Sequence, residues 1–145
     1  MTPDDVAQQL SGIAAADQFE LRSEQLVDGW TASGGGLEAV APILRFMEDH
    51  PAVDFGTPGA LVRFVERFYG KGYEGLLIES IRRKPTAHTA WMLNRLINGT
   101  QEADLRQRLI GLMLQAKAHP LADSTAVEAL RNFLEGLAVA HRSPR

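Results

Sequence analysis

Apolar residues recur along the chain three and four positions apart, which is the spacing of amphipathic α-helices. No run alternates strictly between apolar and polar residues in the manner of a half-buried strand. Clear helical stretches are ALVRFVERFY at 60–69 and AVEALRNFLEGLAVAH at 126–141, and glycines and prolines separate the periodic stretches from one another. The pattern therefore predicts an all-α fold.

Similar residues end three of the predicted helices: Asp-His-Pro at Pro51, Arg-Lys-Pro at Pro85 and Ala-His-Pro at Pro120, at spacings of 34 and 35 residues. Each proline ends one helix and is followed by another, which is typical of stacked antiparallel helix pairs. We expect about three pairs over residues 35–141, as in a short HEAT-like α-solenoid, with an irregular helical bundle as the alternative. Residues 1–22 are expected to form a weakly structured N-terminal segment, and the 145 residues suit a single helical domain.

The second helices of these pairs align without a gap, as VRFVER (62–67), AWMLNR (90–95) and RNFLEG (131–136). Apolar residues occupy the two central columns of the alignment. Polar residues and one tryptophan occupy the flanking columns, which are Arg63, Trp91 and Asn132, and then Glu66, Asn94 and Glu135. Corresponding helices of a solenoid stand side by side, so we expect these columns to form one continuous polar ridge.

Trp91 is out of place on its predicted helix, because it falls among polar residues instead of in the apolar arc. In one interpretation its ring lies in the seam between helices, with one edge exposed to solvent. In the other it is an anchor for a partner protein, since tryptophan and arginine are enriched in binding hot spots. The residues expected to bind a partner on this ridge are Trp91, Asn94, Arg95 and Asn98, together with Arg63 and Glu66.

Few residues suggest catalysis. The chain has no cysteine, and none of its four histidines forms the i, i+4 pair of a helical metal site. The glycines of SGGG at 33–36 lack the lysine of a phosphate-binding loop. We therefore expect no enzyme activity, no cofactor and no metal. The acidic start MTPDDVAQQLSG does not resemble a signal peptide, and no apolar run could span a bilayer, so we expect a cytoplasmic protein without membrane contact.

Charge is distributed unevenly. Residues 1–54 carry ten acidic residues and two arginines, whereas residues 55–145 carry thirteen lysines and arginines and eight acidic residues. An acidic face that includes Glu48 and Asp49 could steer a basic protein, although a solvated helix surface would have the same composition. The basic residues are spread over several helices with acids among them, which argues against direct nucleic-acid binding.

The stretches ILRFMEDHP, ALVRFVERFYGKGYEGLLIESIRRKPT and AWMLNRLINGT resemble small helical bacterial proteins, the immunity partners of polymorphic and contact-dependent growth inhibition toxins. The likeness covers about residues 35–140. It implies a cytosolic inhibitor that binds a cognate toxin domain stoichiometrically; a basic nuclease would suit the acidic N-terminal region. The alternatives are a helical-repeat adaptor between two cellular proteins, and a helical domain that holds a small molecule in a cavity.

Overall fold

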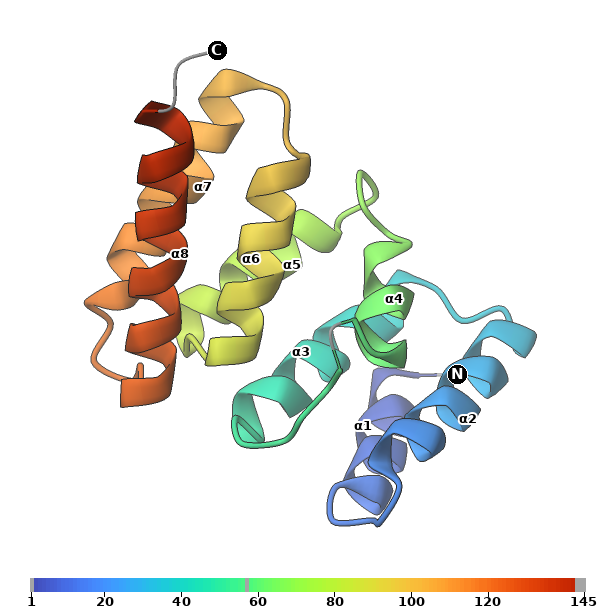
Figure 1. Cartoon of the computed structure of the whole chain (residues 1–145). Helices are drawn as coiled ribbons and strands as arrows, with labels where there is room; N and C mark the ends of the chain where they lie inside the picture. The colour runs from blue at the N-terminus through green and yellow to red at the C-terminus, as the bar shows by residue number, and fades with distance from the viewer. Residues whose placement is uncertain (1, 57, 143–145) are drawn as a thin grey trace. The chain divides into compact units, whose positions relative to one another are not determined.

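The computed structural model describes residues 2–56 and 58–142, and describes side chains as far as residue 138. Within these residues all the regular secondary structure is helical and there is no strand, so the predicted all-α class is confirmed. Figure 1 shows the helices in chain order. They are α1 (Pro3–Ile13), α2 (Phe19–Ala32), the short 3-10 helix η1 (Leu37–Ala39), α3 (Val40–Asp49), α4 (Ala60–Glu66), α5 (Tyr73–Arg83), α6 (Ala87–Gly99), α7 (Ala103–Lys117) and α8 (Ser124–Arg142).

The chain divides into two compact units, residues 1–77 and residues 78–145. We call them the N-terminal unit and the C-terminal unit and describe each by itself. The sequence predicted that the whole chain folds as one domain. The division into two compact units does not test this, and it stays a prediction.

Stacked helix pairs form the N-terminal unit. Helix α1 packs against α2 and α3, and α2 packs against α4. First helix therefore lies on first helix, α1 on α3, and second on second, α2 on α4, as in stacked pairs made of α1 with α2 and of α3 with α4, the helix that follows it in the chain. The pair α1–α2 precedes the residues over which the sequence predicted pairs.

Within residues 1–22, which the sequence predicted to be weakly structured, the described part from Thr2 onward contains the regular helix α1 and the start of α2. The side chain of Thr2 accepts a hydrogen bond from the Asp5 N–H, and the Asp5 carboxylate accepts one from the Thr2 N–H, which is a capping box at the start of α1. These hydrogen bonds with Thr2 hold the pKa of the Asp5 carboxyl below its usual value. Val6 and Leu10, one turn apart, are completely buried, so packing as well as capping holds the helix.

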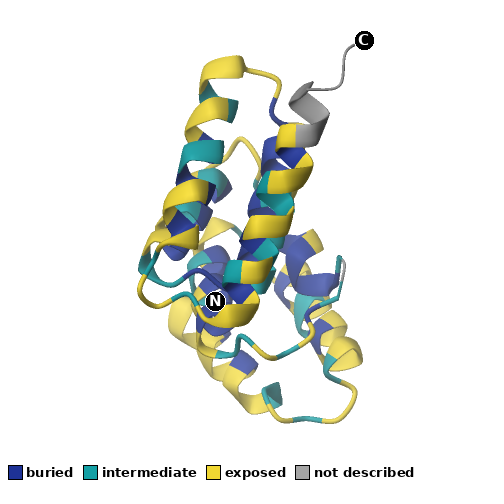
Figure 2. Ribbon diagram, turned by 60° about the vertical axis from the view of Figure 1, so that its left-hand side comes forward, coloured by how far each residue is buried: buried dark blue, intermediate teal, exposed yellow. Residues whose placement is uncertain are grey.

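Three helices pack together in the C-terminal unit. Helix α8 contacts both α6 and α7, and α6 also contacts α7. The apolar positions matched by the sequence alignment differ in burial between α6 and α8, each of which is the second helix of its predicted pair. Met92 and Leu93 of α6 are completely buried, whereas Phe133 and Leu134 of α8 are half-buried. Figure 2 colours the ribbon by burial and shows buried and exposed residues alternating along the helices.

The chain between α3 and α4, residues 50–59, is described except at residue 57 and leads to the N-terminus of α4. Glu20 of α2 reaches the start of α4, where its carboxylate accepts a hydrogen bond from the Ala60 N–H at 3.2 Å. This bond satisfies one of the N–H groups that a helix leaves unpaired at its N-terminus. Gly59 immediately precedes α4, and a Cβ atom placed on it would overlap the carbonyl oxygen of Phe55. The loop therefore depends on a glycine at this position for steric reasons.

We predict that Gly59→Ala destabilises the protein and that Gly12→Ala does not. The backbone of Gly59 is extended, with φ −93°, so alanine is allowed conformationally and the clash with Phe55 alone should lower the free energy of unfolding, by about 1–3 kcal/mol. Gly12 lies in α1 with open space around its Cβ position, so alanine there should raise stability by about 0.5 kcal/mol. Urea denaturation followed by circular dichroism measures both changes, and a loss of the same size in both variants would contradict the steric account.

Candidate protein-binding surface

The side of α6 opposite its buried apolar residues gathers two aromatic rings, a guanidinium and two amides. The His88 and Trp91 rings lie 5.4 Å apart between centroids, tilted by 37°. On the other side, the Arg95 guanidinium carbon lies 5.0 Å from the Trp91 ring centroid, in cation–π geometry. Trp91 is thus held between the side chains one turn before it and one turn after it. We call the set His88, Trp91, Asn94, Arg95 and Asn98 the α6 stripe.

The local sequence holds α6 rigidly enough to present this stripe. Thr86 and Thr89 form a buried capping box, in which each hydroxyl accepts a hydrogen bond from the other residue's N–H, at 3.0 and 3.1 Å. At the other end, the Thr100 hydroxyl donates a 2.7 Å bond to the Leu96 carbonyl. The inner face is buried throughout, through Ala90, Met92, Leu93, Leu96 and Ile97. A helix fixed at both ends and along one face presents its outer side chains in a defined geometry.

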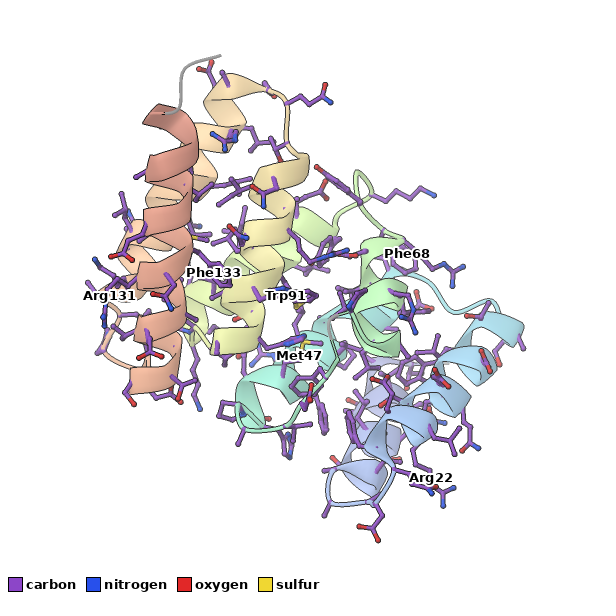
Figure 3. The ribbon with its side chains drawn as sticks, viewed as in Figure 1. Arg22, Met47, Phe68, Trp91, Arg131 and Phe133 are labelled. Atoms are coloured by element: carbon purple, nitrogen blue, oxygen red, sulfur yellow. The ribbon has the colours of Figure 1, made fainter. Side chains whose placement is uncertain are left out.

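The members of the α6 stripe differ in exposure. Arg95 and Asn98 are exposed, whereas His88, Trp91 and Asn94 are half-buried. Figure 3 labels Trp91 among the side chains of its helix. The half-buried tryptophan agrees with both interpretations drawn from the sequence, a ring in a helix seam and an anchor with one face available, and each stays a prediction.

Two of the residues expected to bind a partner, Arg63 and Glu66, belong to α4 in the N-terminal unit. Arg63 is exposed and donates a 3.0 Å hydrogen bond to the Pro58 carbonyl, while Glu66 is half-buried. The α6 stripe lies in the C-terminal unit. The continuous ridge that the sequence alignment predicted from α4 to α6 therefore stays a prediction.

The remaining two candidates lie on α3, and the structure separates them. Asp49 is exposed and lines a groove of about 410 Å³ between α1 and α3, with Asp4, Arg45 and His50. Glu48 is only 6% exposed, which corrects its expected place on an exposed acidic face. The reason is its position on the helix: Glu48 is one turn after the completely buried Leu44 and shares its inward direction.

Helix α2 carries an acidic stripe whose residues were not among those expected from the sequence to bind a partner. Glu20, Glu24 and Asp28 are spaced four residues apart, so they share one face of the helix, and all three are exposed. Glu24 and Asp28 line a groove of about 270 Å³ between α2 and α4, together with Arg63 and Arg67. Like charges four residues apart destabilise a helix by a few tenths of a kcal/mol. The spacing of four was the signal in the sequence that could have revealed this stripe.

Among the residues described, no group of three or more His, Cys, Asp or Glu side chains is placed to hold a metal ion. None of the described helices is long and apolar enough to cross a membrane. Comparison of the chain with protein-family models, curated proteins and solved structures found no match.

We predict that acrylamide quenches the fluorescence of Trp91 several-fold more efficiently than that of Trp30. The chain has two tryptophans, so Trp30→Phe and Trp91→Phe each isolate one of them. Trp30 is 3% exposed and its indole N–H donates to the Gln9 side chain, whereas Trp91 is half-buried. Equal, weak quenching of both tryptophans would place Trp91 in a seam and argue against a free anchor, and circular dichroism checks that both variants are folded.

Proposed function

We propose that the chain is a non-catalytic, protein-binding helical module, and that it acts as an immunity protein that neutralises a bacterial toxin domain by stoichiometric binding. The observation that supports this proposal best is the α6 stripe. Trp91, held between His88 and Arg95 and flanked by Asn94 and Asn98, has the residue types that dominate protein-binding hot spots. Because its neighbours already restrict the tryptophan ring, little side-chain entropy remains to be lost when a partner binds.

The acidic stripe on α2 gives the proposed inhibitor a means of fast capture. Residues 1–77 carry twelve acidic residues and five lysines or arginines. Glu20, Glu24 and Asp28 concentrate part of this charge on one exposed face. Such a face attracts a basic toxin domain over several ångströms and raises the association rate, particularly at low salt.

The adaptor alternative draws on a different observation. The C-terminal unit, residues 78–145, carries ten lysines and arginines and six acidic residues, so the two units have opposite net charges. Two units of opposite charge could attract two different proteins and bring them together. A single retained toxin fragment favours the inhibitor, whereas two cellular proteins retained together favour the adaptor.

We predict that Trp91→Ala reduces retention of the partner when the tagged full-length protein is used to capture proteins from its own bacterium. Loss of a hot-spot tryptophan costs about 2 kcal/mol of binding, or roughly a 30-fold rise in Kd. Mass spectrometry identifies and quantifies the retained proteins. Leu121→Ala is the matched control, because Leu121 is 58% exposed and lies outside α6. A toxin fragment retained equally by wild type and Trp91→Ala would keep the inhibitor proposal and remove Trp91 from the interface.

We further predict that the double change Glu24→Gln and Asp28→Asn slows association with the purified toxin domain and flattens its salt dependence, with a smaller effect on dissociation. The reason is that exposed charges act mainly on the encounter step. Stopped-flow fluorescence at several salt concentrations measures both rates. The control is Glu102→Gln with Asp104→Asn, which removes the same charge from exposed positions of the C-terminal unit. Equal slowing in the two double variants would mean that net charge, and not the α2 stripe, steers the partner.

A further inference from the structure

An apolar groove of about 350 Å³ runs between α7 and α8 in the C-terminal unit. Ile110 and Leu114 line it from α7, and Leu134 and Leu137 line it from α8. Leu114 is 53% exposed, and Ile110 and Leu134 are half-buried. Figure 1 shows the two helices running side by side. The groove therefore exposes leucine and isoleucine side chains that a helical stack normally covers.

The repeat itself indicates what kind of structure covers such a face. Leu134 of α8 aligns with Val65 of α4 and Leu93 of α6, and both of these are completely buried. In the C-terminal unit, α6 is covered by the helix pair that follows it, because it packs against both α7 and α8. By this equivalence, the surface that suits the α7–α8 groove is another helix.

The groove between the first two helices of the chain has a different character. It is lined mainly by polar side chains, namely Asp5, Gln8, Gln9, Gln25 and Ser33, beside Leu26, Gly29 and Trp30. A polar outer face is what a terminal pair of a helical stack needs in water. The α7–α8 groove lacks such a face, so its apolar lining is not a general property of the helix pairs in this protein.

The charges around the α7–α8 groove are mostly positive. Arg106 lines the groove itself. At 3.6 residues per turn, Lys117 falls on the same stripe of α7 as Ile110 and Leu114, and Arg131 falls beside Leu134 on α8. Figure 3 shows Arg131 on the side of α8 away from α6. The neighbouring acids are Glu102 before the start of α7, Asp104 on α7, and Glu128 and Glu135 on α8, and the same count turns each of them further from the groove than these three cations. A second copy of the chain would bring these cations face to face, whereas an acidic helix would complement them.

We propose that the α7–α8 groove binds an amphipathic helix of a partner protein. The apolar stripe of this partner helix packs on Ile110, Leu114, Leu134 and Leu137. Acidic residues beside that stripe face Arg106, Lys117 and Arg131. The surface is distinct from the α6 stripe, and the proposal does not depend on the immunity function. The partner helix takes the place on α7 and α8 that these two helices take on α6.

The test uses the full-length protein and two synthetic stapled helical peptides with the same leucine stripe, one flanked by glutamates and one by lysines. Fluorescence anisotropy measures Kd for each. The glutamate peptide should bind at least about tenfold more tightly than the lysine peptide, which corresponds to about 1.4 kcal/mol. Leu114→Glu should abolish binding, and Arg106→Glu with Arg131→Glu should reverse the preference between the peptides. Leu114 and Arg131 are exposed and Arg106 is half-buried, so circular dichroism confirms that each variant is folded.

Leu121→Glu is the matched control, because Leu121 is as exposed as Leu114 and does not line the groove. Binding of the glutamate peptide should be unchanged in this variant. Three results would overturn the proposal: equal binding to wild type and Leu114→Glu, equal affinity for the two peptides, or no binding of either. Analytical ultracentrifugation tests the alternative occupant, a second copy of the chain. If the wild type is a dimer and the Leu114→Glu variant is a monomer, the groove binds a second copy and the proposal is overturned.

Discussion

A pair of short amphipathic helices leaves apolar surface that only a neighbouring pair can cover, and the rest of the structure depends on this constraint. Helix α4 has seven residues and α3 has ten, lengths at which an isolated helix is marginal in water. Each persists because a face is buried, α3 on α1 and α4 on α2. The same requirement applies in the C-terminal unit, where α6 is covered by α7 and α8. Stacking therefore decides both which helices form and which sides of them remain outside.

The candidate binding surface follows from this division of faces. Burial of Ala90, Leu93 and Ile97 on one side of α6 fixes the helix, and the opposite side carries the half-buried and exposed residues of the α6 stripe. Trp91 is stabilised there by contacts within its own helix, with His88 and Arg95 one turn to either side. Such contacts do not require another helix to form. They restrict the orientation of the Trp91 ring whether it lies in a helix seam or at a free surface.

The sequence predicted the features that depend on helical periodicity. The all-α class and the apolar central columns of the alignment required only spacing and the positions of glycine and proline. The gathering of Trp91, Asn94, Arg95 and Asn98 on α6 followed from the same spacing. Contacts between distant residues could not be predicted in this way. The bond from the Ala60 N–H to Glu20 joins residues forty positions apart, and nothing local distinguishes Glu20 from the other acids of α2.

Glu48 shows a second limit of the same reasoning. An acidic residue type suggests an exposed position, but α3 buries Val40, Ile43, Leu44 and Met47, and Glu48 continues this wide inward arc. The regular helical structure within residues 1–22 was underestimated for a similar reason. The capping box of Thr2 and Asp5 was visible in the sequence, but the burial of Val6 and Leu10 depends on the packing of α1 against α2 and α3.

The opposite charges of the two units restrict the kind of partner that could use both proposed surfaces. A protein that contacts the acidic stripe of α2 meets three exposed acidic residues on one helix face, with Arg63 and Arg67 across the α2–α4 groove, so positive charge opposite the stripe itself favours binding. A helix seated between α7 and α8 must present an apolar stripe with negative charge beside it, opposite Arg106. A single partner would need both features on separate parts of its surface, as a basic domain with an acidic amphipathic helix would provide. Otherwise the two surfaces serve two proteins. Where both surfaces are occupied, an inhibitor and an adaptor therefore differ in whether one polypeptide carries both kinds of complementary charge.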